Sequence, residues 1–295
     1  MVELERLLRW LEASMRLRGI KRHDWEQDGI KLSYHAAGRS GRDHTVVLVH
    51  GLGSNTLSWV KVFGPLARRY RVYALDLPGY GHSPMPTGKD HAAIPDQVTA
   101  VTKFLQSLPE KRVTLVGQSM GGWVCAKVAA QHPEIVEQLV LTNNAGVLYP
   151  EVGELRRMLD LKTQEEVQRF WAALWHQVPG FYRYFTADYV AKMQAPRVIG
   201  FFDSLKEEDF INRDLPNLTM PVSIIWGMSD QFIPTKTVDL MLPLLHNGRV
   251  YWIPRCGHIP ALERPREFVR IMHGLLPPRV RPAEQATVPA ASAVV

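Results

Sequence analysis

The sequence reads Val113-Thr-Leu-Val-Gly117-Gln-Ser119-Met-Gly121-Gly between residues 113 and 122, and a helix-forming segment follows. An apolar run thus leads into a Gly-x-Ser-x-Gly turn. A strained turn from strand to helix needs small neighbours, and Gly117 and Gly121 meet this need. The turn would hold the Ser119 hydroxyl clear of the backbone, facing the positive N-terminus of the next helix. The stretch therefore predicts a nucleophilic serine at the end of a buried strand.

A serine nucleophile needs a base within hydrogen-bond reach, and the base needs an acid that orients it. The apolar run 222–226 is followed by Asp230 in a loop, and the run 249–253 is followed by His258. Taken singly, Asp230 could be a turn or cap residue and His258 a residue at a helix start. Their chain order of Ser, Asp, His, each after a strand, favours a catalytic triad.

A further loop after a strand has the composition of an oxyanion hole, the pair of N–H groups that holds a developing oxyanion. The run 46–49 is followed by His50-Gly51-Leu52-Gly53. We expect the backbone N–H groups of Leu52 and Met120 to be the two donors. Gly51 and Gly53 would let the loop approach the substrate closely, and the place of His50 before the loop favours a structural role.

Five short apolar runs, rich in β-branched residues, indicate strands that are buried on both faces, as in a parallel sheet. They are Val46–Val49, Val72–Leu75, Val113–Val116, Leu139–Leu141 and Val222–Trp226. An earlier half-buried strand is predicted by the alternation of Ile30, Leu32 and Tyr34, with a turn at 38–41. A helix is predicted over Pro95–Leu108, where proline suits the first turn. Alternating strands and helices predict a doubly wound α/β sheet.

The first 22 residues carry an amphipathic helical pattern. Apolar residues recur at helical spacing at Leu4, Leu7, Leu8, Leu11 and Met15. This face could dock on the protein's own surface or make a peripheral contact with a membrane. Charged residues interrupt every apolar run of the segment, which argues against a signal peptide, and no later run has the length of a membrane span.

The alternation stops between residues 146 and 216, which predicts a helical cap inserted between core segments 23–145 and 217–276. Helices are expected over Glu151–Leu161 and Thr163–Trp175. Eleven aromatic residues lie between Phe170 and Phe210, and they could line an apolar pocket or form ordinary core. Residues 277–295, rich in Pro, Ala and Val without periodicity, predict a disordered tail.

Composition excludes several classes of protein. The 295 residues include 46% hydrophobic and 22% charged ones, which suits an ordinary globular protein with a large core. The net charge of +6 is spread among acids, so no nucleic-acid partner is expected. Cys125 and Cys256 are too few for a disulfide framework, and no metal-binding spacing is present. We therefore expect a cytoplasmic protein, in which the N-terminal helix is the segment that would make a peripheral contact with a membrane.

The motifs together resemble the α/β-hydrolase superfamily over residues 25–276. They are His50–Gly53, Asp76–Ser83, Gly117–Gly122, Trp226–Asp230 and Gly257–His258. In this family the Asp76–Ser83 segment is a structural turn. The Ser-Met-Gly-Gly-Trp sequence and the preceding amphipathic helix are similar to bacterial lipases and esterases of the monoacylglycerol-lipase type. The resemblance implies hydrolysis of a small-molecule ester through an acyl-enzyme, without a cofactor.

Other activities of this fold remain as alternatives. Dehalogenases and epoxide hydrolases carry an aspartate where this chain has Ser119, which argues against both. Carbon–carbon hydrolases of ring meta-cleavage products share the serine and the cap. Their pattern has a Gly-Pro-Gly-type oxyanion loop and a Trp after the histidine, whereas this chain has Leu52-Gly53-Ser54-Asn55 and Ile259. A catalytically inert ligand-binding protein on the same fold is the alternative outside the enzymes.

Overall fold

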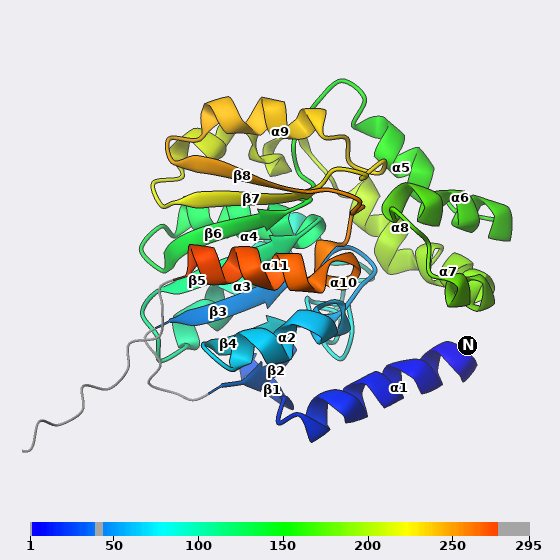
Figure 1. The fold of residues 1–295 in the computed structure, drawn as a ribbon, viewed down its shortest axis with the longest axis horizontal. Coiled ribbons are helices and arrows are strands. Elements are labelled where there is room, and N and C mark those ends of the chain that lie inside the picture. The colour runs from blue at the N-terminus through cyan, green and yellow to red at the C-terminus, as the bar shows by residue number, and fades with distance from the viewer. Residues whose placement is uncertain (1, 39–43, 277–295) are drawn as a thin grey trace, which may run out of the picture.

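The computed structural model describes residues 2–38 and 44–276, which form a mixed eight-stranded sheet with helices on both faces (Figure 1). The strands are β1 (Lys21–Gln27), β2 (Ile30–Ala37), β3 (Thr45–Val49), β4 (Arg71–Leu75), β5 (Val113–Gln118), β6 (Val136–Thr142), β7 (Val222–Gly227) and β8 (Gly248–Ile253). Their order across the sheet is β1-β2-β4-β3-β5-β6-β7-β8. The pairs β1–β2 and β2–β4 are antiparallel, and the six strands from β4 to β8 are parallel.

The helices differ in the face or edge of the sheet that they cover. They are α1 (Val2–Leu17), α2 (Val60–Ala67), α3 (Ile94–Ser107), α4 (Met120–Gln131), α5 (Gly153–Leu159), α6 (Gln164–Leu174), α7 (Thr186–Met193), α8 (Pro196–Asp203), α9 (Lys236–Met241), α10 (Pro260–Glu263) and α11 (Pro265–Leu275). In β3, Val47 and Val49 belong to the core under α3 and α4, while Val46 and Leu48 belong to the core under α2 and α11. This two-sided burial explains the uninterrupted apolar runs.

The predicted α/β fold is confirmed, since each of the five apolar runs lies inside one of the strands β3 to β7. The helix predicted over Pro95–Leu108 is α3, and the strand predicted from Ile30 is β2. Strand β5 lies between β3 and β6, so the turn after it opens near the middle of the sheet.

The prediction of an amphipathic helix over residues 1–22 is wrong at its C-terminal end, where it overlooked a strand. Helix α1 ends at Leu17, and β1 begins at Lys21, so Lys21 and Arg22 are paired with β2. Strand β1 lies at the edge of the sheet and is exposed along nearly its whole length. An edge strand of this kind needs no apolar alternation, and its sequence shows none.

Helix α1 docks on the body of the protein. Met15 is fully buried in the core beside α2, and Leu8 and Leu11 are partly buried against the same core. Glu12 pairs with His82, with 2.6 Å between carboxylate oxygen and imidazole nitrogen. Docking on the protein's own surface is thus confirmed, while the peripheral contact with a membrane stays a prediction. Within the described residues, no helix is long and apolar enough to span a bilayer.

The segment predicted as a cap contains helices and no strand. Helices α5 to α8 all fall between β6 and β7, and Figure 1 shows them gathered at one end of the sheet. We refer to residues 146–216 as the inserted segment. The predicted helices Glu151–Leu161 and Thr163–Trp175 correspond to the shorter α5 and α6. Most of the predicted turn at 38–41 and the predicted disordered tail lie outside the described residues.

Candidate functional site

Ser119 lies in a sharp turn between β5 and α4. Its backbone angles are φ 53° and ψ −123°, a region that a non-glycine residue rarely adopts. The strain is held by two backbone hydrogen bonds, from Ser119 N–H to Thr142 O and from Ala145 N–H to Ser119 O, each 3.1 Å. A Cβ atom on Gly121 would lie 2.3 Å from the carbonyl oxygen of Val49, so only glycine fits there. The local sequence thus explains why the serine is presented at this point.

His258 and Asp230 form a buried hydrogen-bonded pair. His258 Nδ1 lies 2.7 Å from Asp230 Oδ2, and the two side chains are 4% and 0% exposed. A carboxylate only accepts hydrogen bonds, so Nδ1 carries the proton and Nε2 is left as the basic nitrogen. Phe232 packs its ring edge-on against the imidazole, with 5.1 Å between the ring centroids.

Asp230 receives more hydrogen bonds than the sequence suggested. Its Oδ1 accepts from the backbone N–H groups of Phe232 (2.9 Å) and Ile233 (3.0 Å). Its Oδ2 accepts from Asn143 Nδ2 at 2.7 Å in addition to His258. Asn143 was missed by sequence reasoning, although its position directly after the buried strand β6 was a usable signal. It anchors the acid to the neighbouring strand.

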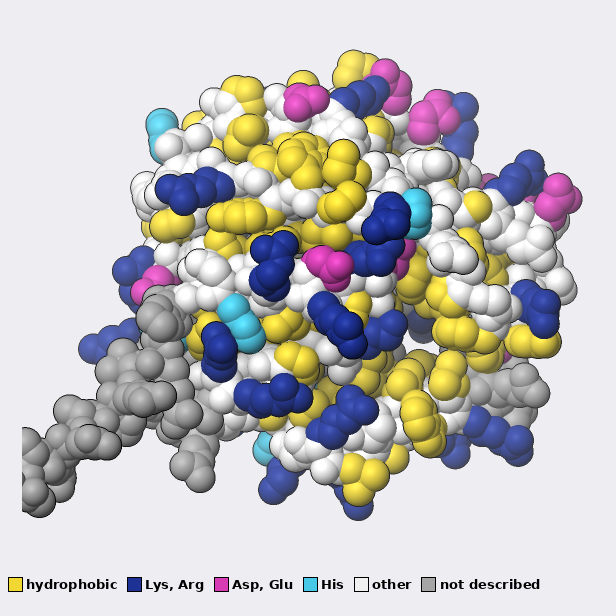
Figure 2. All heavy atoms as spheres, in the orientation of Figure 1, with side chains coloured by type: hydrophobic (Ala, Val, Ile, Leu, Met, Phe, Trp, Pro, Cys, Tyr) yellow, Lys and Arg dark blue, Asp and Glu magenta, His cyan; other side chains and the backbone are white. Residues whose placement is uncertain are grey.

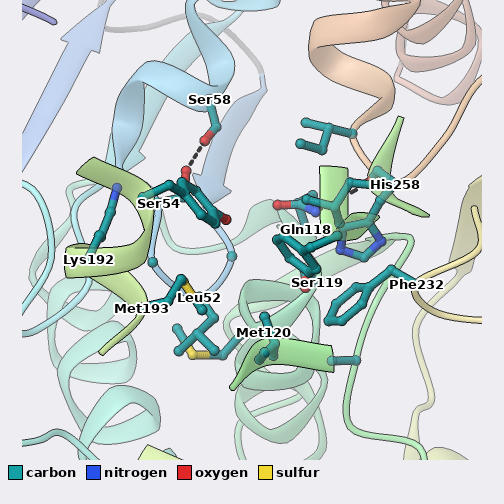
Figure 3. Close-up of a pocket in the computed structure, with 18 of the residues that line it drawn as sticks. Leu52, Ser54, Ser58, Gln118, Ser119, Met120, Lys192, Met193, Phe232 and His258 are labelled. Atoms are coloured by element: carbon teal, nitrogen blue, oxygen red, sulfur yellow. Dashed lines mark hydrogen bonds between the residues drawn. The ribbon is translucent and has the colours of Figure 1, made fainter. Parts of the chain in front are cut away.

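Ser119 and His258 line the same cavity, and Figure 3 shows both side chains beside Phe232. Among the described residues, the Ser119 hydroxyl and the His258 imidazole are not joined by a hydrogen bond. Such contacts often tighten only when substrate binds. Gln118 supports the histidine from behind, because its Nε2 donates to the His258 carbonyl at 3.3 Å.

The loop after β3 lies against Ser119. A Cβ atom on Gly51 would lie 2.9 Å from Ser119 Cβ, so glycine is needed for this approach. In the described part of the chain, the N–H groups of Leu52 and Met120 donate no backbone hydrogen bond to another turn or loop. Both amides are therefore available to a bound oxygen atom.

His50 and Asp76 support this loop from below. His50 Nε2 accepts from Leu77 N–H at 3.0 Å, and its Nδ1 lies 2.8 Å from Gly51 O. Burial lowers the pKa of His50, which favours the neutral ring that this arrangement requires. Asp76 accepts from the N–H groups of Thr56 (2.8 Å) and His82 (2.9 Å). Both residues have the structural role that the sequence indicated.

The inserted segment is bound to the two loops that carry Asp230 and His258. The carbonyl of Ala173 at the end of α6 accepts from Gln231 N–H at 3.0 Å, and that of Leu174 accepts from His258 N–H at 2.6 Å. Glu263 adds a second link, since its Oε1 and Oε2 accept from Gly257 N–H and His176 N–H, each at 2.9 Å. Burial raises the pKa of Glu263, and these two N–H groups oppose that rise.

We expect Glu263→Gln to lower kcat by about tenfold while the protein stays folded. An amide retains one accepting oxygen, so one of the two backbone N–H groups loses its partner, at about 1–3 kcal/mol. The control variant is Glu165→Gln, which makes the same substitution at an exposed position of α6. Ester turnover and thermal unfolding are measured for both variants. Equal kcat values for the two would show that Glu263 does not position His258.

A cavity of about 680 Å³ opens in front of Ser119. Its walls come from the loop after β3, the end of β5, the loops after β7 and β8, the inserted segment, α1 and the start of α2. Figure 2 shows apolar side chains around a hollow on this side of the molecule. Ten of the eleven aromatics between Phe170 and Phe210 line the cavity, all except Tyr184. Six of these ten are partly exposed or exposed and four are buried, so the same residues both line the cavity and belong to the core.

Comparisons with known proteins support the fold described above. The family model described as alpha/beta hydrolase fold matches residues 44–265. The chain is 28% identical to 2-hydroxymuconate semialdehyde hydrolase of Pseudomonas sp. (strain CF600), over 84% of this chain and 91% of the relative. It is 27% identical to monoacylglycerol lipase abhd6-B of Xenopus laevis, over 83% of this chain and 79% of the relative.

Among solved structures, the chain resembles a membrane phospholipase A described as a bacterial virulence factor. The TM-score is 0.81 with 30% sequence identity, and the match covers 92% of this chain and 91% of the other. The similar proteins thus include a lipase and a phospholipase as well as a hydrolase of 2-hydroxymuconate semialdehyde.

Proposed function

Because the chain belongs to the alpha/beta hydrolase family, we propose that it is a serine hydrolase that cleaves carboxylic esters through an acyl-enzyme. The observation that carries the proposal is the buried His258–Asp230 pair beside the strained turn of Ser119, at the floor of an apolar cavity. Short-to-medium acyl esters, including monoacylglycerols, are the proposed substrates.

The chemistry proceeds in two steps. Ser119 Oγ attacks the ester carbonyl carbon while His258 Nε2 takes the hydroxyl proton, and the carbonyl oxygen becomes an oxyanion held by the N–H groups of Leu52 and Met120. The tetrahedral intermediate collapses, His258 returns the proton to the leaving alkoxide, and the alcohol departs. A water molecule then attacks the acyl-enzyme while His258 takes its proton. When this second tetrahedral intermediate collapses, His258 returns the proton to Ser119 Oγ and the carboxylic acid is released.

Support for an ester substrate comes from the relatives and from the shape of the cavity. Lipid-ester hydrolases occur both among the sequence relatives and as the structural neighbour with 30% identity. An apolar cavity of about 680 Å³ has the size of a small-molecule site and suits an acyl chain.

A second candidate is hydrolysis of a carbon–carbon bond in a ring-cleavage product. The observation that favours it is the relative acting on 2-hydroxymuconate semialdehyde, which matches this chain about as well as the lipase does. The two candidates share the serine, the histidine and the acid, so only substrates distinguish them.

We expect kcat/KM for p-nitrophenyl esters to rise from acetate through butyrate to octanoate and then to level off or fall at palmitate. Each CH₂ group buried in the cavity adds up to about 0.8 kcal/mol of binding until the cavity is filled. The esters are assayed beside one ring-cleavage product. An ester series that does not vary with chain length, together with fast turnover of the ring-cleavage product, would favour carbon–carbon hydrolysis instead.

A further inference from the structure

Lys192 is a cation in the wall of an otherwise largely apolar cavity. It lies in the last turn of α7 and lines the same cavity as Ser119. Surrounding protein atoms desolvate its amine and lower the pKa of Lys192 to about 8, and the nearby charge of Arg197 acts in the same direction. In the part of the chain that the structure describes, no carboxylate or carbonyl forms an ion pair or hydrogen bond with this amine. A desolvated charge without a partner is costly, so such a group is a candidate for ligand binding.

The other cations of the cavity wall are already engaged. Lys61 Nζ donates to the carbonyl of Leu262 at 2.8 Å, and the Arg156 guanidinium pairs with the Asp203 carboxylate. The described residues that line the cavity include neither Asp nor Glu. Among the described lysine and arginine side chains of the lining, Lys192 is therefore the one whose charged group is left for a bound anion.

Two serine hydroxyls, which follow the glycine loop after β3, line the cavity together with Lys192. Helix α7 packs on that loop, since a Cβ atom on Gly53 would lie 3.5 Å from Met193 Sδ. The hydroxyls of Ser54 and Ser58 are hydrogen-bonded to each other and also line the cavity. One hydroxyl proton joins the pair, so the other remains for a ligand. Figure 3 shows Lys192 and the two serines on one side of the view and Ser119 and His258 on the other.

We propose that Lys192, with Ser54 and Ser58, forms a subsite for an anionic group of the substrate, a phosphate or a carboxylate carried at a distance from the scissile ester. An ammonium and a hydroxyl are suitable donors to either anion. The apolar walls would hold the hydrocarbon part of the same molecule. The preferred substrates are then anionic amphiphilic esters. This inference rests on the proposed function.

The test compares matched neutral and anionic esters in the wild type and in Lys192→Met. The phosphate arm uses octanoylglycerol and octanoylglycerol 3-phosphate, and the carboxylate arm uses ethyl octanoate and the monoethyl ester of octanedioic acid. In at least one arm, we expect wild-type kcat/KM to favour the anionic ester. Lys192→Met should reduce that preference about tenfold or more, because a charge-assisted hydrogen bond is lost. The arm that responds identifies the anion.

Two variants serve as controls. Lys192→Arg retains the charge and should keep most of the preference. Lys206→Met removes an exposed lysine from the same inserted segment and should leave all four rates unchanged. If Lys192→Met changes the neutral and anionic rates by the same factor in both arms, the subsite does not exist.

Binding of octyl phosphate separates this inference from the proposed function. Isothermal titration calorimetry should show binding to the wild type that weakens about tenfold or more in Lys192→Met. If no ester is cleaved but this difference is found, the proposed reaction is wrong and the anion subsite stands. Equal affinity of both proteins for octyl phosphate, and also for octanoate measured in the same way, overturns the subsite, whatever the esters do.

Discussion

Replacing Ser119 with alanine is expected to lower kcat for ester hydrolysis by roughly 10⁶-fold while leaving the fold intact. The loss is large because the covalent step requires the hydroxyl oxygen, and no other group at this turn can form the acyl-enzyme. The fold should survive because Ser119 is held by its backbone N–H and C=O groups, which alanine retains. Alanine also meets the same backbone strain as serine at φ 53°.

The measurement is steady-state hydrolysis of p-nitrophenyl butyrate beside circular dichroism and thermal unfolding. Ser204→Ala is a matched control, since Ser204 is a serine of the inserted segment whose hydroxyl donates to the Phe201 carbonyl in α8. A folded Ser119→Ala protein that keeps activity within tenfold of the wild type would exclude Ser119 as the nucleophile.

Asp230→Asn is expected to reduce kcat by about 10⁴-fold. Both carboxylate oxygens accept hydrogen bonds, Oδ1 from two backbone N–H groups and Oδ2 from His258 and Asn143. The asparagine side chain has only one oxygen that can accept these hydrogen bonds. Its NH₂ group must therefore point at the N–H donors that one of the two carboxylate oxygens accepted from, and those donors lose their partner. We expect His258 to respond by taking the wrong tautomer, with the proton on Nε2, and this nitrogen can then no longer act as the base.

Stability should fall less than activity, by about 1–3 kcal/mol for the unsatisfied donors. The acids Asp203 and Asp239 provide controls, because one pairs with Arg156 in the inserted segment and the other lies in α9. A larger loss of kcat in Asp203→Asn or Asp239→Asn than in Asp230→Asn would assign the orienting acid to another loop.

The buried part of the fold was predictable because each parallel strand is covered on both faces. Such a strand must be apolar at every position, and this pattern is visible in short windows such as Val46–Val49. Strand β1 was not predictable, because its exposed residues show no apolar alternation. It forms a strand because its backbone pairs with β2, and the sequence of β1 alone does not reveal this pairing. The predicted helix extended too far, to residue 22 instead of Leu17, for the same reason. Lys21 suits a helix as well as an exposed strand, so its identity does not mark the boundary.

Ser119, Asp230 and His258 could be proposed from sequence because each follows an apolar run, and the ends of parallel strands meet at one edge of a sheet. The supporting residues could not be assigned in this way. Glu263 accepts from one nearby N–H group, that of Gly257, and from one in the inserted segment, that of His176. Lys192 is distinguished by having no ion-pair or hydrogen-bond partner among the described residues. Both properties depend on how the inserted segment packs, which no local pattern of residues encodes.

The most direct test of a nucleophilic Ser119 is labelling with a fluorophosphonate, followed by intact mass and peptide mass spectrometry. The phosphonyl group reacts with a serine only where a base and an oxyanion hole activate it. We expect one adduct per chain, on the peptide that contains Ser119, and no adduct in Ser119→Ala. An unlabelled wild-type protein, or an adduct that persists in Ser119→Ala, would contradict the assignment of a serine hydrolase centred on this residue.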